Sequence, residues 1–249
     1  MKKRYKVFGT FILIILVNSF VFLYIYLKNN VSVSLVLSGN KFTSNDEIFS
    51  KFEKRTDVFY WYLNKSNIRE QIRKLPFVKE VEIFPSSLEG FNKLNIAIKE
   101  ENPFYLVKLN DDKVQVISDE GKMLSYLTND KNMLVNWDFF NTLPVISGID
   151  NGLDSSQTLN SRLIYIANFL KNIKTYIPYT INFMYFIPSG EVELKFLEIK
   201  PVVVLDLSKG DEWVDTELKR FNALVNKLGT QINNMSKIDL AYTKVGVLK

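Results

Sequence analysis

The chain has 249 residues, of which 47% are hydrophobic, and it contains neither cysteine nor histidine. Without these residue types it can form no disulfide, no thiolate metal site, no cysteine nucleophile and no histidine general base. The formal net charge is +5, but residues 1–28 hold five basic and no acidic side chains, which leaves 27 of each sign in residues 29–249. The larger part of the chain is therefore neutral, and no basic footprint for nucleic acid is present.

The N-terminal segment from Val7 to Leu27 contains no charged residue and predicts a transmembrane helix in contact with membrane lipid. At about 1.5 Å per residue it would be about 32 Å long, and a hydrocarbon core is about 30 Å thick. Four basic residues precede the segment and only Lys28 follows it, which predicts a single-pass topology with the N-terminus inside. The alternative is a cleaved signal peptide, but no small-x-small cleavage site follows the segment.

Residues 29–101 predict one compact module with the order strand, helix, helix, strand, strand. Alternating hydrophobic residues predict strands over 31–37, 81–83 and 94–98. Ser44 and Glu47 form a capping box that predicts a short helix. Apolar residues at helical spacing predict a second helix over 67–75, which Pro76 ends.

Residues 102–249 are richer in strands and predict a second, mixed α/β domain. The predicted strands are 104–108, 114–117, 121–126, the hairpin 181–187 and 192–196, the buried strand 202–205 and a last strand 238–247. One amphipathic helix is predicted to open at Asp154, and another to cover 213–228 with Gly229 as its C-terminal cap.

Short sequence landmarks follow one another through both predicted domains. They are Gly39-Asn40, Leu75-Pro76-Phe77-Val78, Phe84-Pro85, Glu100, Pro103, Ile117-Ser118-Asp119-Glu120-Gly121, Leu143-Pro144-Val145-Ile146-Ser147-Gly148 and Ile238-Asp239-Leu240-Ala241-Tyr242. Their order resembles that of the FtsQ/DivIB cell-division family, in which a POTRA domain precedes a β domain. Two residues depart from the family pattern: Ala241 stands where the family usually has Arg, and Phe77 where Trp is commoner.

The predicted fold class is thus α+β, with a single transmembrane helix, a POTRA domain of β-α-α-β-β order and a strand-rich mixed α/β C-terminal domain. The predicted domains are a basic tail with the transmembrane helix over 1–28, the POTRA domain over 29–101 and the β domain over 102–249. The predicted location is the bacterial cytoplasmic (inner) membrane at the division septum, with the bulk of the chain periplasmic or extracytoplasmic.

The resemblance implies a divisome scaffold that binds two bitopic division proteins, one FtsB/DivIC-like and one FtsL-like. Together they would help control septal peptidoglycan synthesis by the FtsW–FtsI synthase complex. An edge strand can accept a partner strand by β-augmentation, and the end of the chain is predicted to supply one. The candidate partner-binding residues are Asp239, Leu240, Tyr242, Thr243, Lys244, Val245, Gly246 and Val247. In this strand Ile238, Leu240 and Tyr242 are predicted to share the core face.

No catalytic, cofactor-binding or metal-binding residue is predicted, and the protein is predicted not to be an enzyme. Ser38 and Lys41 fit the Ser-x-x-Lys pattern, but the other motifs of that catalytic machinery are missing. The carboxylate pairs Asp111-Asp112 and Glu100-Glu101 are adjacent residues, which point to opposite faces of a strand. The alternatives are a POTRA-containing protein of envelope assembly or secretion and a membrane-anchored Ser-Lys hydrolase.

Overall fold

The structure is a computed structural model that describes most of the chain. It describes residues 2–55, 57–86, 90–110, 113–127, 137–149, 158–242 and 246–248, and among these it describes only the backbone of 2–11, 28–30, 90, 91, 109, 110, 137 and 246–248. The chain divides into two compact units, Met1–Glu100 and Glu101–Lys249.

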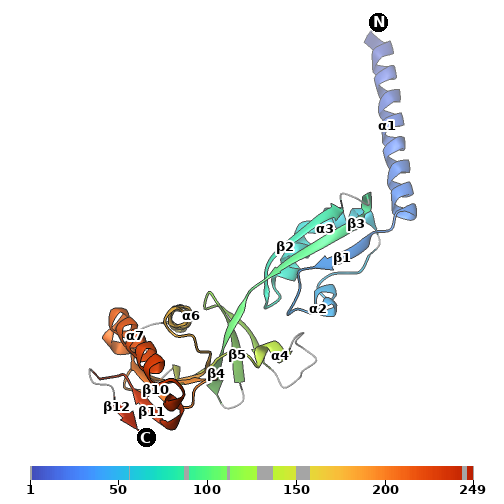
Figure 1. The fold of residues 1–249 in the computed structure, drawn as a ribbon. Coiled ribbons are helices and arrows are strands. Elements are labelled where there is room, and N and C mark those ends of the chain that lie inside the picture. The colour runs from blue at the N-terminus through green and yellow to red at the C-terminus, as the bar shows by residue number, and fades with distance from the viewer. Residues whose placement is uncertain are drawn as a thin grey trace. The chain divides into compact units, whose positions relative to one another are not determined.

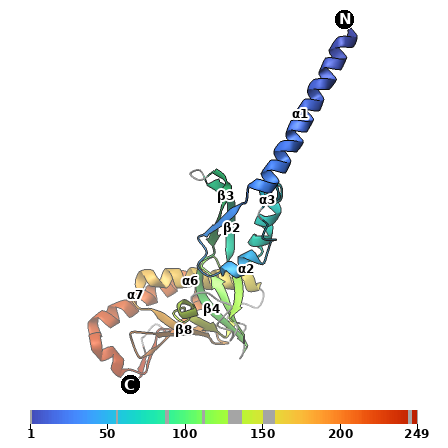
Figure 2. The ribbon, with the colours of Figure 1, turned by 90° about the vertical axis from the view of Figure 1, so that its right-hand side faces the viewer.

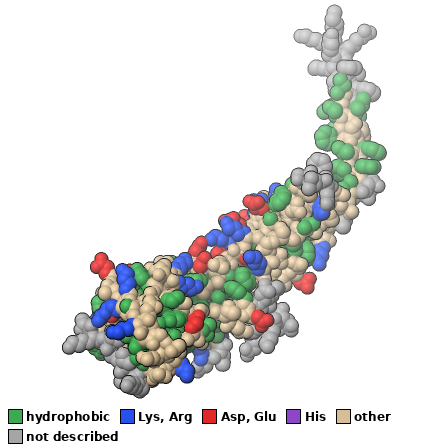
Figure 3. All heavy atoms as spheres, in the orientation of Figure 1, with side chains coloured by type: hydrophobic (Ala, Val, Ile, Leu, Met, Phe, Trp, Pro, Cys, Tyr) green, Lys and Arg blue, Asp and Glu red, His purple; other side chains and the backbone are tan. Residues whose placement is uncertain are grey.

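The first helix, α1 (Lys2–Asn30), corrects the prediction of a membrane anchor. Its sequence includes the polar Asn18 and Ser19, and the Asn18 amide group donates a 2.8 Å hydrogen bond to the Ile14 carbonyl. Figure 3 shows its hydrophobic side chains exposed.

Among the described residues, no helix is long and apolar enough to cross a membrane. The prediction of a transmembrane helix over Val7–Leu27 is therefore wrong. The predicted single-pass location in the inner membrane is overturned with it. The remaining part of the predicted fold class, an α+β chain with two dissimilar parts, is confirmed.

The first unit contains the predicted β-α-α-β-β order (Figure 1). Its elements are β1 (Ser34–Ser38), α2 (Asn45–Phe49), α3 (Val58–Arg73), β2 (Val78–Ser86) and β3 (Gly90–Glu100). The sheet order is β1-β3-β2, with β1 parallel and β2 antiparallel to β3. The core lies between this sheet and α3, and it includes the fully buried Ile48, Ile72 and Ile96.

Local capping explains where the two helices of this unit begin. The Ser44 hydroxyl accepts a 3.1 Å hydrogen bond from the Glu47 amide, as the capping box predicts. The α3 helix begins nine residues before its predicted start at Asn67, because the Asp57 carboxylate caps it by accepting from the Phe59 amide at 2.8 Å. Trp61 is only 1% exposed and anchors this extra length in the core.

The second unit contains a nine-stranded mixed sheet with the order β12-β11-β10-β9-β8-β7-β4-β5-β6. Its strands are β4 (Pro103–Asn110), β5 (Lys113–Ser118), β6 (Met123–Leu127), β7 (Val145–Ser147), β8 (Ile181–Phe186), β9 (Glu191–Phe196), β10 (Val202–Asp206), β11 (Lys237–Asp239) and β12 (Gly246–Leu248). Its helices are α4 (Trp137–Phe140), α6 (Leu159–Tyr176), η1 (Leu207–Lys209), α7 (Asp211–Leu228) and η2 (Gly229–Asn234).

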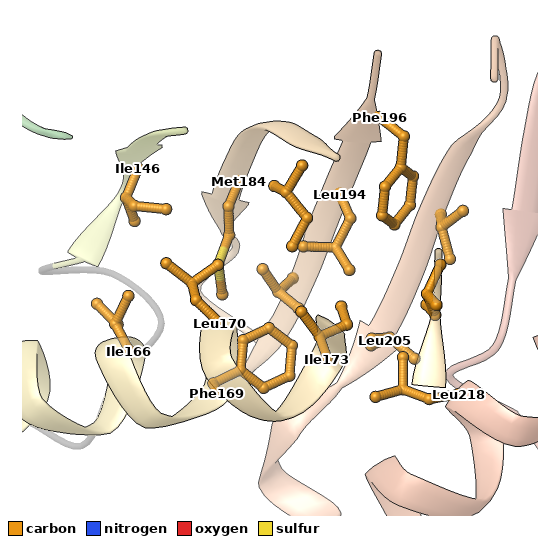
Figure 4. Close-up of a cluster of buried hydrophobic side chains, with 14 of the residues drawn as sticks. Ile146, Ile166, Phe169, Leu170, Ile173, Met184, Leu194, Phe196, Leu205 and Leu218 are labelled. Carbon is orange, nitrogen blue, oxygen red and sulfur yellow. The ribbon is translucent and has the colours of Figure 1, made fainter. Parts of the chain in front are cut away.

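The helices α6 and α7 lie beside each other against this sheet (Figure 2). Figure 4 shows Phe169 and Ile173 of α6 packed with Met184 and Leu194 of the sheet and with Leu218 of α7. Burying such side chains contributes about 1.5–3 kcal/mol each to folding. The amphipathic patterns therefore define one continuous core.

A buried tyrosine ties the sheet to α6. The Tyr105 hydroxyl donates a 2.6 Å hydrogen bond to the Leu163 carbonyl. Burial raises the pKa of the Tyr105 phenol above its ordinary value, so the neutral, donating form is held. The bond joins a strand residue to a helix residue 58 positions later in the chain.

Several sequence predictions for the second unit are confirmed. The hairpin β8–β9 turns at Pro188-Ser189-Gly190, and β10 has a buried interior. The α7 helix begins two residues before its predicted start and ends at Leu228, with Gly229 at its C-terminal cap. Asp154 lies outside the described residues, and the described helix α6 begins after its cap residue Thr158.

Candidate partner-binding edge

The strand β12 lies at one end of the nine-stranded sheet. It pairs antiparallel with β11, with Ile238 opposite Val247 and Asp239 opposite Gly246. Within the described part of the chain, no strand pairs with the other side of β12. Its outer backbone N–H and C=O groups are the kind that accept an added strand.

The predicted partner-binding residues fall into three groups. Asp239 and Leu240 lie at and directly after the end of β11, and Tyr242 follows two residues later. Gly246 and Val247 belong to the edge strand β12. Thr243, Lys244 and Val245 lie outside the described residues.

The prediction of one continuous strand over 238–247 is wrong, because the chain turns after Asp239. The Asp239 carboxylate accepts a 2.9 Å hydrogen bond from the Ala241 amide, which forms a local side-chain turn. Ile238 and Leu240 are fully buried, as predicted, but Ala241 is also buried and Tyr242 is 63% exposed. The alternation of faces ends with the strand, so Tyr242 lies at the surface rather than in the core.

A lysine from elsewhere in the chain contacts this turn, and the sequence patterns do not identify it. The ammonium of Lys209 donates a hydrogen bond to the Ala241 carbonyl and lies 3.4 Å from an Asp206 carboxylate oxygen. It also lies 4.5 Å from the ring centroid of Trp213 and 5.8 Å from that of Tyr242. Both distances are within the range of a cation–π interaction. We call these five residues the Lys209 cluster.

Parallel strands explain why these residues meet. β10 ends at Asp206 and β11 ends at Asp239, and the two strands are parallel neighbours. Residues that follow each strand therefore emerge at the same edge of the sheet. The one sequence signal is that charged and aromatic residues follow both strands, and it becomes useful only when the pairing is known.

Hydrogen bonds keep Asp206 charged beside Lys209. Burial raises the pKa of the Asp206 carboxyl, but bonds from the Ser208 hydroxyl and amide and from Lys209 outweigh this effect, so the pKa is lowered. The Ser208 amide and hydroxyl donate to the same carboxylate oxygen at 3.0 and 2.5 Å. The cluster therefore contains a fixed ion pair at neutral pH.

The charged residues considered earlier for catalysis have structural partners. Glu100 accepts hydrogen bonds from the amides of Lys41, Phe42 and Thr43, and Glu101 pairs with Lys122 at 2.8 Å. Asp111 and Asp112 lie outside the described residues. Among the residues that the structure describes, no group of acidic side chains could hold a metal ion.

The three-stranded sheet with its two helices defines the first unit as a POTRA domain. Residues 33–101 match the family model of the FtsQ-type POTRA domain, so the chain carries a POTRA domain of this type. The resemblance to the FtsQ/DivIB family is confirmed over this domain. No curated protein matches the chain in sequence.

Proposed function

We propose that the protein is a non-enzymatic scaffold of bacterial cell division. The observation that carries this proposal is the FtsQ-type POTRA domain over residues 33–101. The strand-rich second unit, which contains the landmark Ile238–Tyr242, supports the same conclusion. The partners are FtsB/DivIC-like and FtsL-like division proteins, and the complex acts on the FtsW–FtsI synthase that makes septal peptidoglycan.

The partner-binding surface is the edge of the second sheet. A strand of the FtsB/DivIC-like partner adds to β12, and backbone hydrogen bonds provide much of the affinity. Tyr242 is the aromatic contact beside it, since exposed tyrosines are frequent hot spots in protein interfaces. This surface needs no cofactor and no reactive side chain.

Depletion of the protein in its native host tests the cellular role. A scaffold needed for septum formation predicts filamentous or unsegregated cells with normal growth in mass. Light microscopy with a fluorescent cell-wall label reports the outcome. Normal septa after depletion, or an envelope-assembly defect without filamentation, would instead favour the alternative role of POTRA proteins in assembly or secretion.

Tyr242→Ala tests the proposed surface. We expect it to weaken capture of the FtsB/DivIC-like partner by about tenfold or more, because about 1.4 kcal/mol of contact energy corresponds to a factor of ten. Tyr126→Ala is the matched control, since Tyr126 is 52% exposed on β6 at the opposite edge of the same sheet. Pull-down titration with purified full-length proteins measures both. Equal losses from the two variants would exclude β12 as the site.

A further inference from the structure

We infer that Lys209 is a positioning residue for the partner-binding edge. It holds the chain where that chain leaves β11, and it sets the orientation of the exposed Tyr242 ring. Only the effect of Lys209 on partner binding rests on the proposed function. The structural part of the inference concerns Ala241, Tyr242 and the strand β12 and can be tested without a partner.

The first support is the place of Lys209 in the topology. Lys209 ends η1, directly after β10, and it contacts Ala241, which is 32 residues away in sequence. Directly after β11, the Leu240 amide donates to the Val204 carbonyl at 2.9 Å. The bond from Lys209 follows one residue later, at the point where the chain turns.

The second support is the number of interactions that one ammonium group makes. A lysine ammonium has three donors and no acceptor, and here it meets a carbonyl, a carboxylate and two aromatic rings. Asp206 has a side chain only 15% exposed, so solvent screens its attraction to Lys209 less than at an open surface. These contacts restrict the conformation of the Lys209 side chain, which is itself 39% exposed.

The third support is the position of the exposed Tyr242 ring beside Lys209. The Tyr242 side chain is 63% exposed, and the ammonium of Lys209 lies 5.8 Å from its ring. The same ammonium lies closer to Trp213, which belongs to the well-packed helix α7. Lys209 thereby links the exposed Tyr242 ring to Trp213 of α7. A preordered ring lowers the entropy that binding must overcome.

Hydrogen exchange of the full-length protein provides the test. Lys209→Met keeps most of the aliphatic stem and removes the charge. We expect the amides of Ala241, Tyr242 and β12 to exchange about tenfold faster or more, with unchanged exchange in β8 and β9. Lys237→Met is the control, because Lys237 is also partly exposed and pairs with Glu193 at 3.9 Å, yet it lies outside the Lys209 cluster. Unchanged exchange in Lys209→Met, or an equal effect of Lys237→Met, overturns the inference.

A rescue variant and a binding cycle separate positioning from a general loss of structure. Lys209→Arg keeps the cation and is expected to restore most of the slow exchange, whereas global unfolding of Lys209→Met would raise exchange throughout β8 and β9. In partner titrations, Lys209→Met and Tyr242→Ala should be non-additive, with the double variant close to Tyr242→Ala alone. Additive losses would mean that Lys209 acts independently of Tyr242 and would overturn its positioning role.

The two proposals can fail separately. If no division protein binds the wild-type chain, the proposed function fails, and the hydrogen-exchange result still decides the role of Lys209. If the partner binds and Tyr242→Ala weakens it, but Lys209→Met changes neither exchange nor affinity, only the inference about Lys209 fails.

Discussion

Glu100→Gln should lower the free energy of unfolding of the POTRA unit by about 2–3 kcal/mol, which is large for one isosteric change. The Glu100 carboxylate accepts hydrogen bonds from three successive amides, those of Lys41, Phe42 and Thr43, at 2.6, 2.8 and 2.8 Å. These bonds fasten the loop after β1 to the end of β3.

Glutamine keeps the shape of the side chain but loses two features. It has one acceptor oxygen in place of two, and its amide group turns an N–H toward a backbone N–H. Hydrogen bonds to a charged group contribute about 1.5–3 kcal/mol each, and an amide left without a partner costs about 1–3 kcal/mol. Because Glu100 is half-buried, we use the lower part of both ranges for the expected loss of stability.

The measurement is urea unfolding followed by the NMR signal of the Trp61 indole N–H. This group is buried in the POTRA unit and donates to the Arg55 carbonyl at 2.7 Å. Glu80→Gln is the control, since Glu80 forms an exposed ion pair with Lys99 and should change stability by less than about 0.5 kcal/mol. Similar urea-unfolding midpoints for the two variants would contradict the proposal that Glu100 stabilises the loop after β1 by holding it to the end of β3.

Gly148→Ala should destabilise the second unit by about 3–4 kcal/mol. Gly148 has a φ of +73°, which side-chain-bearing residues rarely adopt and which costs them about 1–2 kcal/mol. A Cβ at this position would also overlap the Phe186 carbonyl oxygen at a separation that real structures essentially never show. Phe186 ends β8, which pairs with β7 and β9, so its backbone cannot move away freely.

Gly210→Ala separates the conformational cost from the clash. Gly210 lies in the same unit and has a φ of +87°, but a Cβ there would meet nothing within 4 Å. Its backbone, with φ 87° and ψ 165°, lies in a region essentially restricted to glycine, so we expect a cost of about 1–3 kcal/mol from conformation alone. Denaturant unfolding followed by the methyl signal of the buried Met184 compares the two variants. If Gly210→Ala were as destabilising as Gly148→Ala, the close approach to β8 would have no energetic importance.

Local sequence patterns determined the features that depend on neighbouring residues. The capping pair Ser44 and Glu47 predicted the start of α2, and Pro188-Ser189-Gly190 predicted the β8–β9 turn. The amphipathic spacing of 213–228 predicted α7, and the order of landmarks predicted the POTRA domain. The caps, the turn and the amphipathic spacing each lie within one element or its immediate turn, so their physics can be read from adjacent positions, whereas the landmarks act as a set along the chain.

Features that depend on distant contacts were decided only by the tertiary structure. Alternation suggested one last strand, yet the chain turns at Asp239 and continues as the separate edge strand β12. Here the local pattern was correct for residues 238–240. It failed where the Asp239 carboxylate accepts a hydrogen bond from the Ala241 amide.

The partner-binding edge shows most clearly what the sequence determined and what only the tertiary structure decided. Sequence alone determined that this chain has no histidine or cysteine chemistry and that its end carries a strand-forming landmark. Tertiary structure decided that Tyr242 is exposed and that Lys209 contacts Ala241 from 32 residues away. The physical reason is that strand order and register bring distant residues together, and the parallel pairing of β10 with β11 is a property of the whole sheet.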